Sequence, residues 1–333
     1  MQDVPLVARE VSKAFERKTG ERVAALDRVS LEARAGTLTA LVGPDGAGKT
    51  TLIRLAAGLL APDAGRVEVL GLDAAAEPQA VQERIGYMPQ KFGLYEDLSV
   101  QENLDLYADL HGVGAAERRR RYPELMEMTA LGPFRKRLAG RLSGGMKQKL
   151  GLACTLVRAP ELLLLDEPTV GVDPLSRREL WAIVLRLVRS EGLTVLLSTS
   201  YLDEAERCDH ALVMHLGRAL ADGRPQEITA RAAGRTFVAT PRAGETAREL
   251  QARLLAAPGI VDAVPAAGRV RFVAAEAGGV PAGAEAALAG AHVDPADPLF
   301  ESGFMTLLHE NWGQTPISDA AGDGSENRSI SEE

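Results

Sequence analysis

The order of apolar and polar positions in residues 1 to about 230 predicts alternating strands and helices. Short apolar runs of strand length lie at residues 38–42, 162–165 and 195–198. Residues 50–60 follow a glycine-rich turn and place their apolar side chains at helical spacing. Strands and helices that alternate between Gly- and Pro-rich turns are typical of α/β proteins. We therefore expect an α/β domain over residues 1–230.

The middle of this region has a different pattern. From about residue 96 to residue 158 the strand signals vanish, and helical spacing appears at residues 100–110 and 118–128. Strand patterns resume at residue 162, and a hairpin is expected around Leu216–Arg218. We interpret residues 91–160 as a helical subdomain inserted into the α/β domain.

After Arg231 the composition shifts to Ala, Gly and Pro, which indicates a second domain at residues 231–312. Its pattern predicts, in order, strand 236–240, helix 245–256, strands 260–264 and 269–274, a weaker helix 282–289, strand 291–293 and helix 299–310. That order resembles a ferredoxin-like βαββαβ unit with a closing helix. Residues 313–333 are rich in Ser, Gly, Asp and Glu without periodicity, and we expect a disordered acidic tail.

Composition and charge narrow the function classes. The apolar fraction of 46% and the charged fraction of 25% are typical of a soluble globular protein. No apolar run approaches the roughly 18–20 residues needed to cross a bilayer, and the N-terminus lacks the pattern of a secretory signal. We expect a cytoplasmic protein whose membrane role comes through partner subunits. The net charge of −8 does not favour a nucleic-acid partner, because such proteins usually present a basic face.

Two further features indicate structure rather than chemistry. Cys154 and Cys208 lie in helix-like stretches without metal-ligand spacing, as expected of small buried side chains in a reduced protein. The charge run Arg118–Arg121 lies on a predicted helix and indicates a solvated face.

A glycine-rich segment between an apolar strand and a helix carries the first chemical signal. It matches the pattern G-x-x-x-x-G-K-[ST] with Gly43, Pro44, Asp45, Gly46, Ala47, Gly48, Lys49 and Thr50, and Thr51 follows. Its glycines allow the backbone to wrap closely around phosphates, and the helix N-terminus adds a partial positive charge. We expect Lys49 to pair with the β- and γ-phosphates of ATP and Thr50 to hold Mg²⁺. The segment alone indicates a P-loop NTPase.

A pair of acidic residues ends the apolar run 162–165. Asp166 and Glu167 stand about 115 residues after the P-loop. Asp166 is placed to bind Mg²⁺ directly or through water, and Glu167 to polarise the attacking water as a general base.

A third segment selects one family among P-loop proteins. Residues 142–146 read Leu-Ser-Gly-Gly-Met, about 20 residues before Asp166. A Ser-Gly-Gly turn that opens a helix binds anions through backbone N–H groups, a hydroxyl and the helix dipole. With the other two motifs it makes about 230 residues resemble an ATP-binding-cassette (ABC) ATPase. The resemblance implies a central mixed sheet, an antiparallel β subdomain and the helical insertion, followed here by a small α+β C-terminal domain.

The resemblance also assigns roles to single residues. Ser143, Gly144 and Gly145 are expected to bind the γ-phosphate of ATP held by a second cassette, so that two cassettes close around two nucleotides. Phe15 stands where the family stacks adenine, although a lone Phe can equally be a core residue. Gln90 is expected to sense Mg²⁺ and the attacking water, and Asp173 to lie in the loop that crosses the dimer interface.

Other segments resemble the ABC-2 type exporter ATPases, in particular residues 96–103, residues 171–174 and the C-terminal extension. In the family, the loop at residues 90–98 docks the permease, and we expect exposed side chains there at Phe92, Leu94 and Tyr95. Ordinary packing within the helical subdomain is the alternative.

One position departs from the family. The strand 194–198 is expected to lead to a histidine that donates a hydrogen bond to the γ-phosphate, and this chain has Ser200 there. A serine is too short to reach as far, and the loss of such a donor typically lowers the rate by about 10²–10³. We expect ATP to bind nevertheless. With the Pro-Asp-Gly-Ala-Gly form of the P-loop, Ser200 resembles the first cassette of two-cassette multidrug exporters.

The sequence therefore predicts an ATPase subunit of an ABC-2 type exporter, bound at the inner face of the membrane through its permease. We expect a heterodimer in which a second cassette brings its own histidine. A homodimer in which Thr199 or a water replaces the missing donor is the alternative. Two other functions are left open: a non-transport ABC protein of translation or DNA repair, and a regulatory cassette that senses nucleotide with little turnover.

Overall fold

The structure is a computed structural model that describes residues 4–17 and 19–312. It forms two compact units that divide between Pro225 and Gln226, and each is described by itself. The division lies a few residues before the boundary expected near residue 230, because the first unit ends with the β-hairpin that closes at Gly223. The predicted acidic tail lies outside the described residues. Among the described residues, no helix has both the length and the apolar character needed to span a membrane.

The first unit contains the predicted α/β elements. Its strands are β1 (Leu6–Glu16), β2 (Arg22–Ala33), β3 (Leu38–Val42), β4 (Ala64–Val69), β5 (Leu72–Asp73), β6 (Ile85–Met88), β7 (Leu162–Asp166), β8 (Thr194–Thr199), β9 (His210–His215) and β10 (Arg218–Gly223). Its helices are α1 (Lys49–Ala56), α2 (Pro78–Gln82), α3 (Val100–Leu110), α4 (Ala115–Met128), α5 (Gly144–Thr155), α6 (Pro174–Glu191) and α7 (Leu202–Ala205), with 3₁₀ turns η1 (Gly132–Phe134) and η2 (Ala139–Arg141).

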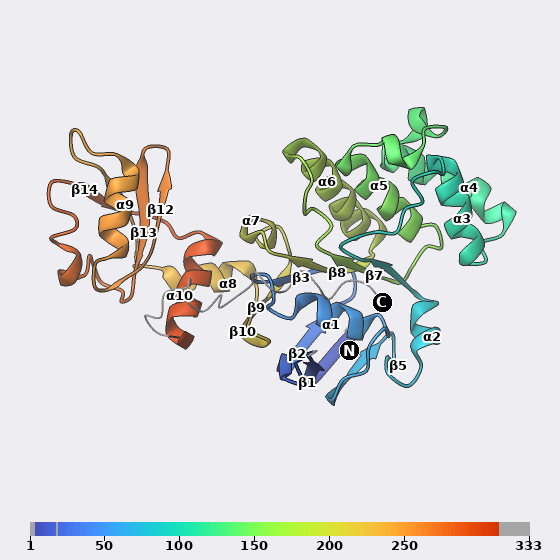
Figure 1. Cartoon of the computed structure of the whole chain (residues 1–333), viewed down its shortest axis with the longest axis horizontal. Coiled ribbons are helices and arrows are strands. Elements are labelled where there is room, and N and C mark those ends of the chain that lie inside the picture. The colour runs from blue at the N-terminus through green and yellow to red at the C-terminus, as the bar shows by residue number, and fades with distance from the viewer. Residues whose placement is uncertain (1–3, 18, 313–333) are drawn as a thin grey trace. The chain divides into compact units, whose positions relative to one another are not determined.

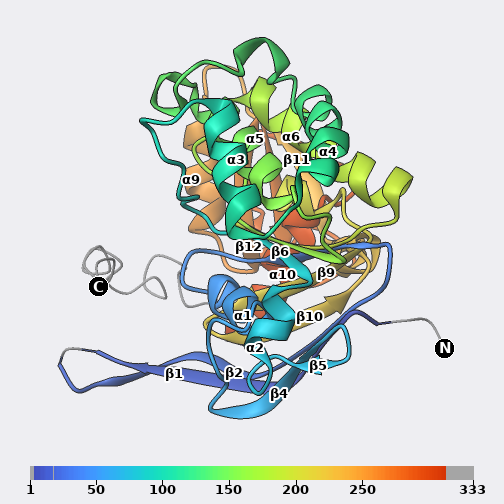
Figure 2. The same ribbon diagram turned by 90° about the vertical axis from the view of Figure 1, so that its right-hand side faces the viewer.

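These strands form two sheets. The central sheet has the order β10-β9-β3-β8-β7-β6, with parallel neighbours except for the antiparallel pair β10 and β9. The second sheet, β2-β1-β4-β5, is entirely antiparallel. Helices α3 to α6 lie on one side of the central sheet, and α1 lies on the other, toward the antiparallel sheet (Figures 1 and 2). This arrangement is the fold class expected from the sequence.

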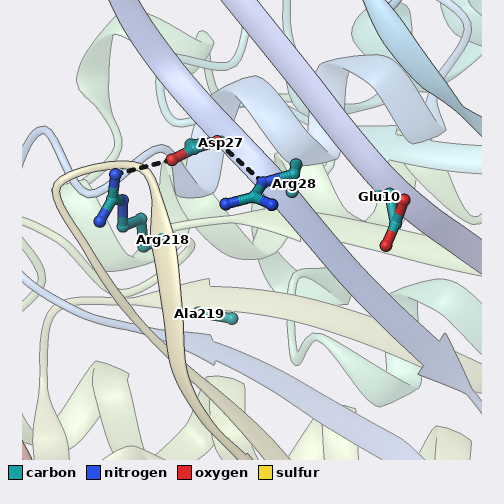
Figure 3. Close-up of a pocket in the computed structure, with 5 residues that line it drawn as sticks. All are labelled: Glu10, Asp27, Arg28, Arg218 and Ala219. Carbon is teal, nitrogen blue, oxygen red and sulfur yellow. Dashed lines mark ion pairs between the residues drawn. The ribbon is translucent and has the colours of Figure 1, made fainter.

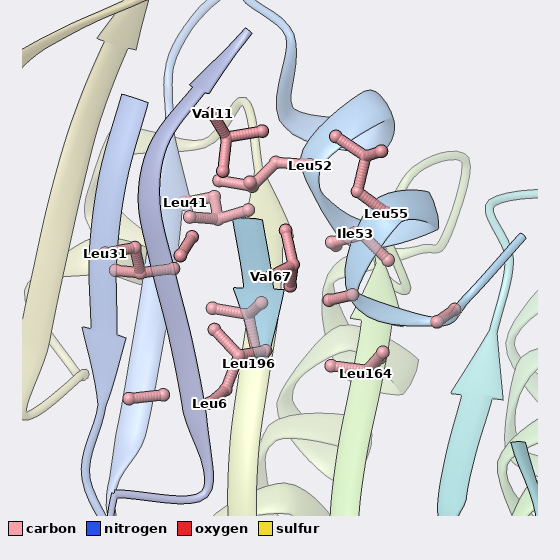
Figure 4. Close-up of a cluster of buried hydrophobic side chains, with 14 of the residues drawn as sticks. Leu6, Val11, Leu31, Leu41, Leu52, Ile53, Leu55, Val67, Leu164 and Leu196 are labelled. Carbon is pink, nitrogen blue, oxygen red and sulfur yellow. The ribbon is translucent and has the colours of Figure 1, made fainter. Parts of the chain in front are cut away.

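Helix α1 fills the space between the two sheets. Leu52, Ile53 and Leu55 are fully buried on it and pack in one cluster with side chains of both sheets (Figure 4). Strands β7 and β8 are buried at every position, because layers cover both faces of the central sheet. The P-loop is therefore held at both ends by core, by β3 before it and by α1 after it.

A polar pocket marks where the antiparallel sheet meets the β9–β10 hairpin. Asp27 donates its backbone N–H to the Gly217 carbonyl at 2.8 Å, and its carboxylate pairs with Arg218 at 2.9 Å and with Arg28 at 3.5 Å (Figure 3). The pocket of about 300 Å³ is also lined by Glu10 and Ala219. Because two arginines face two carboxylates, the pocket is electrically balanced, and we assign it a structural role.

The helical subdomain begins with a strong helix start. The Ser99 hydroxyl accepts from the Glu102 N–H, and the Glu102 carboxylate accepts from the Ser99 N–H, which is a capping box. Helix α3 covers the predicted residues 100–110, and α4 begins three residues before the predicted 118. Helix α5 packs against both α3 and α6.

The second unit is built on an antiparallel sheet of order β14-β11-β13-β12, the strand order of a ferredoxin-like unit. Its elements are α8 (Pro225–Thr229), η3 (Ala230–Ala232), β11 (Thr236–Thr240), α9 (Ala247–Leu255), β12 (Ile260–Ala266), β13 (Arg269–Ala274), η4 (Ala282–Ala284), β14 (His292–Pro295) and α10 (Phe300–Trp312). The rings of Phe237 and Phe272 stack at 5.3 Å in its core.

The prediction of a weaker helix at residues 282–289 is wrong. Only the 3₁₀ turn η4 forms there, and turns follow to Gly290, whose φ is +79°. A Cβ at Gly283 would lie 2.9 Å from the Pro258 carbonyl oxygen, so the backbone is pressed against the turn before β12. With glycine at both ends and only Ala284 and Leu288 buried, the segment has too little apolar surface to hold a helix.

Candidate functional site

The residues expected to carry chemistry lie at one edge of the central sheet. Strands β3, β8, β7 and β6 are neighbours in that order and run parallel, so their carboxyl ends meet at the same edge. The P-loop follows β3, Ser200 follows β8, Asp166 ends β7 just before Glu167, and Gln90 comes shortly after β6. Ligands of open α/β sheets bind outside this edge.

The P-loop has a backbone that only glycine adopts easily at two positions. Gly46 and Gly48 have φ of +78° and +98°, in the left-handed region. A side chain at Gly48 would also collide with the Ala25 carbonyl and Leu26, and one at Gly43 would collide with the Met214 carbonyl. The fold therefore holds the loop closely from behind. Pro44, Asp45 and Gly46 are exposed at its tip, and Ala47 is buried.

The Lys49 ammonium is the centre of a buried polar group. It donates to the carbonyls of Gly43 and Pro44 at 2.8 and 3.0 Å and pairs with Glu167 Oε1 at 3.0 Å. The other oxygen, Glu167 Oε2, accepts from Gln90 Nε2 at 2.9 Å. Lys49 and Glu167 are both nearly fully buried. The structure thus brings these three predicted residues together and leaves the Glu167 carboxylate held from two sides.

The Glu167 backbone is unusual for its residue type. Its φ of +47° lies in the left-handed region, which costs a non-glycine residue free energy and is concentrated at functional sites. Its backbone N–H donates to the Ser198 hydroxyl at 2.9 Å and to the Ser198 carbonyl at 3.2 Å. The chain therefore turns sharply at the end of β7, at the residue expected to act as the base.

A set of hard oxygen atoms lies beside this group. The Thr50 hydroxyl donates to Asp166 Oδ1 at 3.0 Å, and the Ser198 hydroxyl donates to the same oxygen at 2.7 Å. Hydroxyl and carboxylate oxygens are the ligands that Mg²⁺ prefers, usually completed by water and substrate phosphates. Among the described residues no group of three or more His, Cys, Asp or Glu could hold a metal. Thr50 and Asp166 supply a hydroxyl and a carboxylate oxygen of the kind that Mg²⁺ binds when a nucleotide completes its coordination. Thr51, the next residue on α1, is half-buried.

Ser200 lies directly beside the P-loop. The Gly43 N–H donates to the Thr199 carbonyl at 3.3 Å, and Ser200 is the next residue. Its side chain is partly exposed, and within the described part of the chain it has no hydrogen-bond partner. The Thr199 hydroxyl, the alternative donor, is instead buried and donates to Glu204 Oε2 at 2.6 Å. The Thr199 hydroxyl is therefore already engaged with Glu204, although the Thr199 carbonyl contacts the P-loop.

The Ser-Gly-Gly turn and Asp173 form a second group. The Ser143 hydroxyl caps α5 by accepting from the Met146 N–H at 3.3 Å, and Asp173 caps α6 by accepting from Leu175 and Ser176. The contacts with Ser176 hold the pKa of Asp173 below its ordinary value. A Cβ at Gly145 would overlap the Ser176 side chain, so the two caps lie against each other.

No hydrogen bond or ion pair within the described residues joins this second group to the P-loop. The structure therefore divides the predicted binding residues into two groups. The first contains the P-loop, Gln90, Asp166, Glu167 and Ser200. The second, exposed except for the buried Gly145, contains Ser143, Gly144 and Asp173.

Phe15 lies near the end of β1 and is 42% exposed, which argues against the core alternative. Asp63 steadies this strand: its carboxylate accepts from Lys13 Nζ and from the Ala14 N–H, each at 2.9 Å. The hydrogen bond from Lys13 and the one from Ala14 lower the pKa of Asp63 to about 2. The ring is therefore held on a strand and available to a flat ligand.

The loop after β6 differs in part from the expectation. Tyr95 is 56% exposed, but Phe92 and Leu94 are half-buried. The Phe92 ring lies 5.1 Å from the Tyr107 ring and packs on Gly151 of α5. A pocket of about 320 Å³ opens beside it, lined by residues of the loop, the end of α1, β6, α3 and α5. Packing therefore shapes this groove, and Tyr95 is the large side chain that the loop leaves exposed.

Two residues of the site were not expected from the sequence. Ser198 joins Asp166 to the Glu167 backbone, and Glu204 receives four hydrogen bonds behind Ser200. Ser198 could have been found from the parallel pairing of β7 and β8, which places it opposite Asp166. The signal in the sequence is a serine, Ser198, in an otherwise apolar strand.

Comparisons with known proteins agree with this geometry. The profile of the ABC transporter family matches residues 26–170. The probable multidrug ABC transporter ATP-binding protein YbhF of Escherichia coli (strain K12) is 48% identical over 318 residues, which cover 92% of this chain and 53% of that protein. The daunorubicin resistance ATP-binding protein DrrA3 of Streptomyces coeruleorubidus is 44% identical over 220 residues, or 66% of this chain and 69% of that protein. The chain thus spans about half the length of the relatives it matches first.

Solved structures give the same family. An ATP-binding subunit of an ABC transporter is 32% identical, with a TM-score of 0.60, and covers 68% of this chain and 92% of its own. The cassette MJ0796, in a dimeric post-hydrolysis state bound to ADP and Pi, is 25% identical with a TM-score of 0.60. The match covers 66% of this chain and 98% of the MJ0796 chain. The chain belongs to the ABC transporter family of ATP-binding proteins and carries its ATPase cassette.

Proposed function

We propose that the chain binds and hydrolyses MgATP at a dimer interface and powers an ABC-2 type membrane exporter. The observation that carries the proposal is the meeting of Lys49, Glu167 and Gln90 within 3.0 Å contacts, next to the Thr50–Asp166 pair. These side chains supply a cation for phosphates, a general base, a water-orienting amide and two oxygen ligands for Mg²⁺.

Each residue has one task in this proposal. In hydrolysis the water oxygen forms a bond to the γ-phosphorus of ATP, the bond from that phosphorus to the β–γ bridging oxygen breaks, and ADP and phosphate are the products. Lys49 exchanges its present partners for phosphate oxygens, and Thr50 and Asp166 would hold Mg²⁺, which would neutralise phosphate charge there. Glu167, released from Lys49, accepts a proton from the attacking water at a carboxylate oxygen, and Gln90 holds that water. Phe15 stacks on the adenine.

Ser200 makes this site slow. It stands beside Gly43, where a donor to the γ-phosphate is needed, but its hydroxyl is too short to replace an imidazole. We expect a rate about 10²–10³ below that of a site with histidine. ATP binding is retained, because Lys49, Thr50 and Phe15 do not depend on Ser200.

The second group of residues serves a different nucleotide. Ser143, Gly144 and Asp173 are exposed, and among the described residues no hydrogen bond or ion pair joins them to the P-loop of their own chain. We propose that they complete the site of a second cassette. A heterodimer is favoured, because a partner with histidine would gain a fast site from this intact surface. The relatives that are about twice as long leave room for a second cassette in one chain.

The partner in the membrane is a permease. The groove beside Phe92 and Tyr107 is lined by residues of the α/β part and of the helical subdomain. A permease helix bound in it would therefore be displaced when these two parts move relative to each other. We place the chain in the cytoplasm, at the inner face of the membrane through that contact. The names of relatives, multidrug and daunorubicin resistance, support drug-like substrates as the class exported.

One experiment separates this function from the alternatives. The chain is expressed in bacterial cells, and its ATP hydrolysis and its distribution between membranes and ribosomes are measured. Slow hydrolysis with membrane association supports the exporter subunit. Association with ribosomes would favour a translation factor. Tight ATP binding without hydrolysis, whether the chain is found with membranes or with ribosomes, would favour a regulatory cassette.

A further inference from the structure

Behind Ser200 lies a carboxylate that the proposed reaction does not use. Glu204, on α7, is completely buried, and the four side chains that bond to its carboxylate are all hydrogen-bond donors. Oε1 accepts from Thr169 Oγ1 at 2.8 Å, from Arg177 Nε at 2.6 Å and from Trp181 Nε1 at 2.9 Å. Oε2 accepts from Thr199 Oγ1 at 2.6 Å.

These donors come from three separate segments. Thr169 lies in the turn from Glu167 to Asp173, which we call the interface turn. Arg177 and Trp181 lie on the first turns of α6, whose cap is Asp173. Thr199 ends β8, and its hydroxyl also accepts from the Tyr201 N–H at 3.0 Å, so it holds the backbone on both sides of Ser200. One buried carboxylate thus joins the segments that carry Glu167, Asp173 and Ser200.

A second contact closes the same group. Arg177 Nη2 binds both oxygens of Asp203 at 2.8 and 2.9 Å, and its guanidinium lies 4.3 Å from the centre of the Tyr201 ring. The segment after Ser200 is therefore fixed to α6 by charge and by ring contact. A movement of α6 and its cap displaces residues 199–204 unless buried hydrogen bonds break.

We propose that Glu204 is a positioning residue that couples the interface turn to residue 200. It does not touch nucleotide. Closure of a second cassette against Asp173 is transmitted through Thr169 and Arg177 to Glu204, and from there through Thr199 to the position beside the γ-phosphate. The use of this coupling in catalysis rests on the proposed function. The physical link between the segments does not.

The substitutions that test the link leave the carboxylate in place. Removing Glu204 itself would leave Arg177 without its buried partner and could unfold the chain. Thr169→Val and Thr199→Val each remove one hydroxyl at nearly constant volume, on opposite sides of Glu204. Thr129→Val is the matched control, because Thr129 is equally buried and its hydroxyl bonds only within its own helix, to the Leu125 carbonyl at 2.6 Å.

Hydrogen exchange on the full-length chain without nucleotide measures the link directly. Thr199→Val is expected to speed exchange at residues 168–173, and Thr169→Val at residues 200–206, each by about tenfold, as for the loss of one hydrogen bond to a charged group. Thr129→Val is expected to change neither segment. If each threonine variant alters only its own surroundings, the coupling does not exist.

ATP hydrolysis measures the use of the link, in the Ser200→His background where turnover is expected to be fast. Each threonine variant is expected to lower kcat about tenfold with KM within about twofold, and the double variant to lose little more than either. A loss no larger than that of Thr129→Val would overturn the positioning role. If even Ser200→His hydrolyses no ATP, the proposed function fails, while the exchange experiment still decides on the link.

Discussion

The two groups of binding residues in the first unit differ in how they are built. The P-loop edge is self-paired: Lys49, Asp166 and Glu167 are buried, Thr50 is half-buried, Gln90 is exposed, and all five side chains are hydrogen-bonded to one another or to nearby backbone. The surface formed by Ser143, Gly144 and Asp173 is exposed, and its side chains only cap their own helices. Under the proposed function, the Lys49–Glu167 pair of the first group has to separate before a nucleotide binds, whereas the second group has no such pair to break.

The groups also differ in completeness. At the P-loop edge one expected group, the histidine, is replaced by Ser200, whereas every expected residue of the Ser143–Asp173 surface is present. Under the proposed function, this difference means that the chain is slow at its own site and still completes the site of a partner. The predictions below test each half of that contrast.

The largest effect is expected at the base. In the Ser200→His background, Glu167→Gln should lower ATP turnover by about 10²–10⁴, because the amide cannot accept the proton of water. In the wild-type chain the same change should have a much smaller effect, since Ser200 already limits the rate. Steady-state phosphate release measures both. Equal losses in the two backgrounds would mean that Ser200 does not limit the reaction.

A mixing experiment tests the two groups against each other. Chain carrying Ser200→His and Gly145→Ala has a repaired P-loop edge and a damaged surface, because the new Cβ overlaps Ser176. It should be nearly inactive alone, and adding wild-type chain should raise turnover by about 10² by supplying an intact surface. A matched addition of Gly145→Ala chain should give no rise. Equal activity with either addition would contradict the division of labour.

A smaller effect is expected at the adenine platform. Phe15→Ala should raise KM for ATP about fivefold or more with kcat nearly unchanged, since stacking of a base on an aromatic ring contributes about 1–3 kcal/mol. Phe134→Ala, in the helical subdomain, is the control and should leave KM unchanged. An unchanged KM in Phe15→Ala would place the nucleotide elsewhere.

The smallest effect is expected outside both groups, in the second unit. Burial raises the pKa of Asp262 on β12, and burial together with the Asp262 carboxylate raises the pKa of Glu301 on α10. A raised folded pKa contributes stability that is present below the ordinary value of 4.5 and is lost as pH rises through the folded value. Glu301→Gln cannot ionise, so it should stabilise the unit at pH 7.5 relative to wild type, by less than about 1 kcal/mol.

Calorimetry at pH 4 and 7.5 measures this difference, with the exposed Glu285→Gln as control. The gain should shrink at pH 4, and ATP turnover should not change. A gain of the same size at both pH values would mean that ionisation of Glu301 is not its cause.

Local sequence patterns were sufficient for much of the fold. The apolar run before the P-loop, the helix after it and the strand ending in Asp166 are each specified by neighbours in the chain, and the predicted fold class is confirmed. The prediction of a helix at residues 282–289 was wrong because the backbone there packs against Pro258, which lies in another turn and is not a neighbour in the sequence. The direction of Phe92 depends in the same way on Tyr107 and Gly151.

The candidate site shows the same limit. The motifs identified residues by type and spacing, and the parallel order of β3, β8, β7 and β6 then explains why they meet at one edge. Ser198 and Glu204 could not be found by spacing, because their partners lie about 30 residues away or on other elements. The roles given to the site residues are still predictions.

The most direct test of the contrast is ATP hydrolysis by the purified full-length chain, as wild type and as Ser200→His, with ATP binding measured in parallel. The account predicts similar binding affinities and a rate that rises by about 10²–10³ when histidine is restored. Equal and substantial turnover by both chains would contradict it, and the chain would then be a self-sufficient ATPase.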